Sequence, residues 1–333
     1  MRVVIVDFNH LAYSYFHSRF RLSCRVESGG ESVIKDTTVQ SGTLKCLYRW
    51  SNKGSNPLAV CFDRPVPARK AFFDAKLDMT VGTDKEYKGG REKMPEQMFE
   101  AIQDVERMLR NAGVSVFAEQ GYESDDLVLA CIKRAKVKYP NIPIDVVTND
   151  ADLLPLVDDT VSVFLRSKTS TYAVDKSIEK AHYVQVTPDN FSEIVENLSA
   201  YKGYDLPYNT ILLHKLLRGD MSDKFGRKDI SAHFSPKKWN NMIARMREDM
   251  VNFPEVFRYG EPQTKIMCRD TGLEFEGTLQ DALNSPNKSN YYQKIGNSEE
   301  LDAILTLLRE YSDLSEEQLS VVESIYWGMN LNQ

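Results

Sequence analysis

Three short apolar runs that end at carboxylates constrain the fold of this chain more than any other feature. Short apolar runs bounded by polar turns are typical of buried strands. Parallel strands share one edge of an open α/β sheet at their carboxyl ends, and ligands bind beyond that edge. We therefore expect the acids to converge. The runs are residues 2–7 ending at Asp7, residues 57–62 followed by Asp63, and residues 144–148 followed by Asp150 and Asp152.

Helical segments alternate with these strands through the first 200 residues. This alternation predicts an α/β fold with a mostly parallel central sheet flanked by helices. Residues 25–36 are expected to form a loop or a hairpin, and the region after 225 is expected to be helical and polar. Ser315 and Gln318 make a capping box before a last amphipathic helix. Further predicted elements are helices at 8–20, 38–50, 95–111, about 124–137 and 207–218, and strands at 114–117, 161–165 and 172–174.

Two more acidic groups stand beside predicted helix ends. Glu123, Asp125 and Asp126 crowd the start of one helix, and Asp220 and Asp223 follow another. The acids at helix starts have a local explanation. Asp150 would be an N-cap and Asp152 a first-turn acid of the helix that follows, and the helix dipole would favour the acids of the Glu123 group by about 0.3–1 kcal/mol each. The recurrence of acids in five separate places favours a shared site instead. Carboxylates that share a site cannot all ionise unless cations neutralise them.

The predicted site has only oxygen ligands, which select hard cations. We expect Mg²⁺, with Mn²⁺ as a substitute, rather than zinc. Mg²⁺ keeps several waters and few direct carboxylates, so nine acids suggest two or three ions with an outer shell. Paired ions suit the in-line hydrolysis of phosphodiesters. His10 and His17 are interpreted as structural or surface residues, and no Ser–His or Cys–His pair competes with the acids.

Residues 64–94 interleave basic and aromatic side chains after two prolines. This pattern suits single-stranded nucleic acid, whose bases stack on rings and whose phosphates pair with cations. An exposed, mobile surface loop without a role in binding is an equally good interpretation, because five acids in the segment dilute its positive charge. Connections of this length inside a compact domain are usually functional or disordered. The basic and aromatic residues include Arg69, Lys70, Tyr87, Lys88 and Arg91.

Composition limits the classes of function. The net charge of −6 by itself argues against a nucleic-acid binder. Nine acids fall in one predicted site, however, so the distribution of charge matters more than its sum. Five cysteines without a C-x-x-C pair argue against a disulfide framework and fit a reducing compartment. Without a bilayer-spanning apolar run or a signal segment, we expect a cytoplasmic protein.

Six motifs occur along the chain in a characteristic order. They are Val6-Asp7-Phe8-Asn9, Cys61-Phe62-Asp63, Tyr87-Lys88-Gly89-Gly90-Arg91 with Met94-Pro95, Gly121-Tyr122-Glu123-Ser124-Asp125-Asp126, Thr148-Asn149-Asp150-Ala151-Asp152, and Gly219-Asp220-Met221-Ser222-Asp223. Over about residues 1–225 the chain thereby resembles the 5′-nuclease family. This family includes flap endonucleases, the 5′→3′ exonuclease domain of bacterial DNA polymerase I, and phage 5′→3′ exonucleases and ribonucleases H. The chain resembles the stand-alone phage enzymes most.

The resemblance implies a PIN-like fold with two metal positions beneath a helical arch formed by residues 64–94. A 5′ single strand would pass through this arch. Tyr87 would stack near the scissile nucleotide, and Lys88 and Arg91 would contact the scissile phosphate. Arg69 and Lys70 belong to the same substrate-binding set. Asp7, Asp63, Glu123 and Asp125 would serve mainly the first metal position, and Asp126, Asp150, Asp152, Asp220 and Asp223 the second or its outer shell.

The chain departs from the family after its last acidic motif. Family members usually continue into a glycine-rich helix–hairpin–helix that grips duplex DNA, often with a K⁺ ion. Residues 224–229 retain one glycine, which weakens the expectation of K⁺, and Arg227 and Lys228 would rebuild the duplex contact. We expect a catalytic domain at 1–225 and a C-terminal region at 226–333. This region would bind duplex DNA and dock a replication protein, either a single-strand binding protein or a clamp.

The resulting expectation is a Mg²⁺-dependent, structure-selective 5′ nuclease. It would remove RNA primers or 5′ flaps from DNA and RNA–DNA hybrids, with no membrane partner. Asp7, Asp63, Asp150, Lys88 and Arg91 would carry the chemistry. Two alternatives remain open at this point. One is a PIN-type ribonuclease, and the other is a non-catalytic replication protein that binds DNA junctions and uses the acids as helix caps.

Overall fold

The computed structural model describes most of the chain and divides it into two compact units. The first unit holds the described residues up to Asn190, and the second holds those from Phe191 onward. None of the helices in the described ranges combines the length and the apolar character needed to cross a membrane. The described residues are 1–18, 21–28, 31–65, 93–166, 183–198, 201–207, 210–219, 226–251, 263–268, 291–296 and 298–329.

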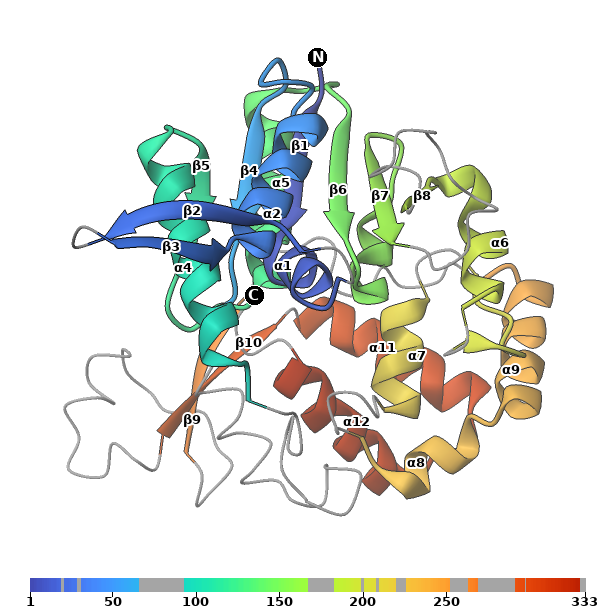
Figure 1. The fold of residues 1–333 in the computed structure, drawn as a ribbon. Coiled ribbons are helices and arrows are strands. Elements are labelled where there is room, and N and C mark those ends of the chain that lie inside the picture. Colours follow the sequence, from blue (N-terminus) through green and yellow to red (C-terminus); the bar gives the residue numbers. More distant parts are fainter. Residues whose placement is uncertain are drawn as a thin grey trace. The chain divides into compact units, whose positions relative to one another are not determined.

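The first unit is built on a six-stranded sheet of order β5-β4-β1-β6-β7-β8 (Figure 1). Its neighbouring strands run parallel except for β7 and β8, which pair antiparallel. The predicted mostly parallel sheet is therefore confirmed. The central strands β1 and β6 are buried along their whole length, as expected of apolar runs. The strands are β1 (Val3–Asp7), β4 (Leu58–Cys61), β5 (Ser115–Phe117), β6 (Ile144–Thr148), β7 (Val161–Arg166) and β8 (Tyr183–Val186).

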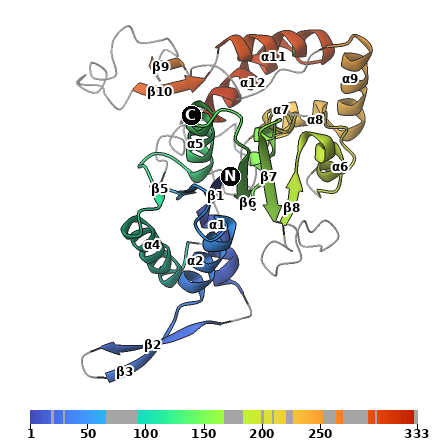
Figure 2. The same ribbon diagram turned by 90° about the horizontal axis from the view of Figure 1, so that it is seen from above.

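Helices cover both faces of this sheet. Figure 2 shows α1, α2 and α4 on one side of the strands and α5 on the other. The α4 sequence places Met98, Ile102, Val105 and Leu109 on one buried stripe, which is the spacing of an amphipathic helix. The helix predicted from residue 8 ends earlier than expected. The helices are α1 (Phe8–Phe16), α2 (Thr38–Trp50), α4 (Glu96–Asn111) and α5 (Ser124–Lys138).

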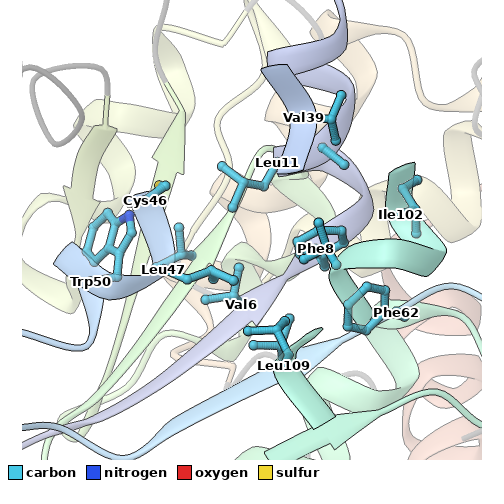
Figure 3. Close-up of a cluster of buried hydrophobic side chains, with 14 of the residues drawn as sticks. Val6, Phe8, Leu11, Val39, Cys46, Leu47, Trp50, Phe62, Ile102 and Leu109 are labelled. Carbon is cyan, nitrogen blue, oxygen red and sulfur yellow. The ribbon is translucent and has the colours of Figure 1, made fainter. Parts of the chain in front are cut away.

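The main hydrophobic core lies between the sheet and the helices α1, α2 and α4. Figure 3 shows Phe8 beside Phe62, and their ring centroids are 4.3 Å apart. Both side chains are fully buried. Phe8 follows Asp7 and Phe62 precedes Asp63 in the sequence. The core therefore fixes the backbone at the two points from which these carboxylates project.

A two-stranded antiparallel ribbon separates α1 from α2. It consists of β2 (Ser23–Ser28) and β3 (Glu31–Asp36), which confirms the hairpin alternative for residues 25–36. Figure 2 shows the ribbon projecting away from α1 and α2. Val33 is 50% exposed and Ile34 is 70% exposed. None of the ribbon side chains that the structure describes, at 23–27 and 32–36, belongs to the core.

The second unit is mainly helical. Ser315 and Gln318 form the predicted capping box, because the Ser315 backbone N–H donates to Gln318 Oε1 and the Gln318 N–H donates to Ser315 Oγ. Strands β9 (Gln263–Cys268) and β10 (Tyr291–Gly296) form an antiparallel pair that the sequence did not predict. The helices are α6 (Phe191–Glu196), α7 (Ile211–Arg218), α8 (Lys228–His233), α9 (Pro236–Glu248), α11 (Ser298–Tyr311) and α12 (Glu316–Met329).

A buried histidine sits among aromatic rings in this unit. The ring of His214, on α7, makes edge contacts with Tyr201, Tyr204 and Trp239. Its Nε2 is buried and has no hydrogen-bond partner among the described residues. Burial is the main reason that the pKa of His214 falls from 6.5 to about 3, with smaller contributions from Arg218 and Lys215.

Several predictions fall outside the described residues. The strand predicted at 172–174 and nearly all of the predicted arch belong to this group. So do the acids Asp220 and Asp223. The predicted division into a catalytic domain at 1–225 and a DNA-binding region at 226–333 concerns function, and it stays a prediction.

Candidate active site

Asp7 occupies the centre of the acidic edge of the sheet. It is the last residue of β1 and only 2% exposed. Ser124 Oγ donates a hydrogen bond to Asp7 Oδ1 at 2.7 Å, and Thr148 Oγ1 donates one to Asp7 Oδ2 at 2.8 Å. Each carboxylate oxygen is therefore held by one hydroxyl group from a distant part of the chain.

Asp63 is tied to the same point through Ser124. It lies two residues beyond β4, and its Oδ1 accepts a hydrogen bond of 2.8 Å from the Ser124 backbone N–H. The Asp63 backbone N–H donates to Asn9 Oδ1, at 3.3 Å. Ser124 thus contacts Asp7 with its side chain and Asp63 with its backbone.

Asp150 joins this arrangement through Thr148. Its backbone N–H donates to Thr148 Oγ1 at 2.9 Å. The Asp150 side chain also caps a short 3-10 helix, Ala151–Leu156, by accepting a hydrogen bond from the Asp152 backbone N–H. The local explanation of Asp150 as a cap is therefore correct. It does not exclude a place in the site, because the cap lies directly beyond β6.

His10 stands between two of the acids. Its Nε2 lies 3.7 Å from Asp7 Oδ2 and 3.7 Å from Asp150 Oδ2. Interpreting His10 as only a structural or surface residue therefore missed its position. The i, i+3 spacing from Asp7 at the start of a helix was the signal that could have found it.

The motif that holds Glu123, Asp125 and Asp126 forms the start of α5. Glu123 and Asp126 make a reciprocal capping box, in which the Glu123 N–H donates to Asp126 Oδ2 at 2.9 Å. Asp125 Oδ1 accepts a hydrogen bond from the Asp126 N–H. The interpretation as helix caps is correct for Glu123 and Asp126. The same helix start carries Ser124, so these acids lie next to a residue that contacts both Asp7 and Asp63.

The carboxyl group of Asp7 has a raised pKa. Burial, together with the nearby charge of Asp63, raises the pKa of Asp7 from 3.8 to about 6. His10 and the hydroxyls of Ser124 and Thr148 act in the opposite direction and favour the charged carboxylate. A bound cation would relieve the cost of the buried charge.

The chemistry of this donor set suits a hard divalent cation. Asp7, Asp63 and Asp150 offer oxygen atoms, which Mg²⁺ and Mn²⁺ prefer. Across the described residues, no three His, Cys, Asp or Glu side chains are grouped closely enough to hold an ion by themselves. Asp220 and Asp223 lie beyond that part of the chain.

The predicted substrate-binding residues are only partly described. Arg69, Lys70, Tyr87, Lys88 and Arg91 lie outside the described ranges. In the second unit, Arg227 pairs with Asp229 at 2.6 Å, and Lys228 is exposed at the start of α8. The Arg227 guanidinium makes two hydrogen bonds to this carboxylate, so a phosphate would have to compete with Asp229 for it.

Comparison with known proteins gives a consistent result. The family model of the N-terminal resolvase-like domain of 5′-3′ exonucleases matches residues 2–182, more than half of the chain. A 5′-3′ exonuclease from Mycoplasma pneumoniae is 32% identical over 242 residues, which cover 72% of this chain and 70% of that protein. Another from Buchnera aphidicola is 30% identical over 178 residues, covering 54% of this chain and 56% of the relative.

Longer relatives and solved structures extend this comparison. DNA polymerase I of Lactococcus lactis subsp. cremoris is 27% identical over 162 residues, covering 49% of this chain but only 16% of the polymerase. The flap endonuclease of bacteriophage T5, solved in a complex with DNA and metal ions, has a TM-score of 0.50 at 16% identity. The alignment covers 74% of this chain and 75% of the T5 chain. This structural likeness concerns the fold.

Proposed function

We propose that this chain, which belongs to the 5′-3′ exonuclease family, is a metal-dependent 5′ nuclease that hydrolyses phosphodiester bonds in DNA. The observation that carries the proposal is the linkage of Asp7, Asp63 and Asp150 through Ser124 and Thr148 at one edge of the sheet. RNA-primer and 5′-flap removal during replication, from DNA and RNA–DNA hybrids, is the specific role that we assign to it.

The acids are proposed to hold two or three divalent ions, with Mg²⁺ as the natural one and Mn²⁺ as a substitute. When bound, these ions would activate water and stabilise the leaving oxygen. Asp7, Asp63, Glu123 and Asp125 are assigned mainly to the first position. The second is assigned to Asp126, Asp150, Asp152, Asp220 and Asp223. The T5 enzyme of the same fold was solved with DNA and metal ions, which supports extending both ligands to this chain.

The basic and aromatic residues complete the proposed mechanism. Lys88 and Arg91 would neutralise the charge that develops on the scissile phosphate, and Tyr87 would stack on the neighbouring base. Arg69 and Lys70 would guide the 5′ single strand. Arg227 and Lys228 are proposed to contact duplex DNA. A K⁺ ion is not part of this proposal. A single-strand binding protein or a clamp is the proposed partner, and a bacterial or phage-infected cytoplasm is the proposed location.

A single substitution tests the proposal. We expect Asp150→Asn to reduce cleavage of a 5′-labelled flap substrate in Mg²⁺ by at least about 100-fold, because loss of a ligand should exceed the usual outer-shell effect. Asp104→Asn is the control, since Asp104 lies on α4 and its carboxylate bonds to Arg107 and Gln40. Circular dichroism should record native spectra for both variants. Full activity in folded Asp150→Asn would refute the proposed role.

The same assay separates the alternatives. Nicked, flapped and RNA-primed duplexes are compared with single-stranded RNA, with and without Mg²⁺. Cleavage confined to RNA, with indifference to 5′-ended DNA, would support a PIN-type ribonuclease. Junction binding without cleavage, and without stoichiometric Mn²⁺ uptake in calorimetry, would support a non-catalytic replication protein.

A further inference from the structure

Two buried hydroxyl groups hold the carboxylate of Asp7 from opposite sides. Ser124 is 4% exposed and Thr148 is 3% exposed, so water hardly competes for their hydrogen bonds. Each donates to a different oxygen of Asp7, at 2.7 and 2.8 Å. With both oxygens engaged, rotation of the carboxylate about its own axis would break two hydrogen bonds at once.

Each hydroxyl residue also links Asp7 to a second acid. The Ser124 backbone N–H donates to Asp63 Oδ1, and Thr148 Oγ1 accepts from the Asp150 backbone N–H. A single residue therefore fixes the relation between Asp7 and Asp63, and another fixes the relation between Asp7 and the segment of Asp150. These two residues therefore link Asp7 to two other proposed ligands, Ser124 through its side chain and its backbone N–H, and Thr148 through its hydroxyl.

The neutral character of these donors is significant. A lysine or arginine in the same place would also orient Asp7, but it would neutralise the charge that attracts a cation. A hydroxyl orients the oxygen and leaves both the negative charge and further lone pairs available. The combination of full burial, neutral donors and shared acids is what an orienting outer shell requires.

We propose that Ser124 and Thr148 are positioning residues, which set the orientation of Asp7 and its separation from Asp63 and Asp150 for divalent-cation binding. This inference rests on the proposed function and deepens it. The residues do not touch the substrate. They act through the carboxylates, so their removal changes metal affinity first and cleavage as a consequence.

If Ser124 and Thr148 had a purely structural role, their substitution would lower stability without changing metal affinity. The chain offers a matched control for each residue. Ser51 is also 4% exposed, and its Oγ donates to the Tyr48 carbonyl and accepts from the Gly54 N–H. Thr43 is fully buried, and its Oγ1 donates to the Val39 carbonyl at 2.7 Å. Both controls remove a buried, hydrogen-bonded hydroxyl from the same unit without touching an acid.

The experiment uses the full chain and four variants: Ser124→Ala, Thr148→Val, Ser51→Ala and Thr43→Val. Calorimetry measures Mn²⁺ affinity, thermal melting in EDTA measures stability, and flap cleavage is titrated with Mg²⁺. We expect Ser124→Ala and Thr148→Val to weaken Mn²⁺ affinity by about 10- to 100-fold and to raise the Mg²⁺ requirement similarly. The controls should lower the melting temperature without changing metal affinity. Thr148→Ser, which keeps the hydroxyl, should restore wild-type affinity.

The outcomes separate this inference from the proposed function. Wild-type cleavage together with unchanged Mn²⁺ affinity in Ser124→Ala overturns the inference alone. Mn²⁺ uptake by a wild-type chain that cleaves nothing overturns the proposed nuclease, while the affinities of the variants still decide the positioning role. A wild-type chain that takes up no Mn²⁺ overturns both. If Thr148→Val fails to fold, the pair of Ser124→Ala and Ser51→Ala decides.

Discussion

Asp7 shows how a single residue can combine burial with charge. Its position at the end of a fully buried strand excludes solvent, and its pKa is raised to about 6 for that reason first. Hydrogen bonds from Ser124 and Thr148 favour the charged form. The side chain is therefore oriented but incompletely compensated, which is the condition in which a cation binds most favourably.

His214 is a buried base whose charged form is disfavoured by its surroundings, both by burial and by the nearby positive charges of Arg218 and Lys215. Its pKa is lowered from 6.5 to about 3, so between these pH values the unfolded chain binds a proton that the folded chain does not. Stability must therefore fall as pH decreases through this window. At pH 5 the loss is about 2 kcal/mol.

We expect this loss to disappear in His214→Phe. Urea unfolding at pH 7 and pH 5 measures it, and the wild type should lose about 2 kcal/mol more than the variant between the two conditions. The aromatic surroundings of His214 should accept a phenyl ring, since Nε2 has no hydrogen bond to lose among the described residues. An equal loss in both proteins would show that another group is responsible.

At the scale of elements, the order of the strands places three of the acids at one edge of the sheet. The strands β4, β1 and β6 are adjacent and parallel, so Asp7 ends one strand, and Asp63 and Asp150 follow the other two, at the same edge. The hairpin of β2 and β3 contributes nothing to this edge. Its described side chains, at 23–27 and 32–36, are exposed, and Leu22 and Thr37 already close its base through a backbone hydrogen bond of 2.8 Å.

The hairpin should therefore be dispensable for folding. Replacing residues 24–35 with Asn-Gly, a favoured two-residue turn, keeps Ser23 and Asp36 paired. We expect the free energy of unfolding to change by less than about 1 kcal/mol, because the described side chains that are lost, at 24–27 and 32–35, are exposed and the loop becomes shorter. Urea denaturation measures this change. A loss of several kcal/mol would mean that the ribbon stabilises the unit through contacts beyond its base.

For the whole molecule, metal binding and stability should be linked. A ligand that binds only the folded state stabilises it by mass action, by about 2.7 kcal/mol at 100 times its dissociation constant. We expect Mn²⁺ at that excess to stabilise the wild type by this amount over EDTA, and Asp63→Asn to lose most of the gain. Thermal melting with and without Mn²⁺ measures both. An equal gain in Asp63→Asn would place the ion elsewhere.

The sequence was sufficient to predict the parallel sheet and the shared edge at which Asp7, Asp63 and Asp150 stand, because strand and helix patterns are local and parallel strands share an edge. The contacts within the site could not be predicted. Ser124 and Thr148 lie 117 and 141 residues from Asp7 along the chain, and no periodicity indicates such hydrogen bonds. The strands β9 and β10 were not predicted from the sequence, because short polar strands show little alternation of apolar and polar residues.

The long separation between Asp7 and its two hydroxyl partners has a consequence for synthesis. After Asp7 has been added, synthesis must add 117 more residues to reach Ser124 and 141 more to reach Thr148. Until then the growing polypeptide lacks the groups that orient its first carboxylate. A partial chain that stops before residue 148 therefore lacks one of the two hydrogen bonds that hold the carboxylate proposed to bind the metal.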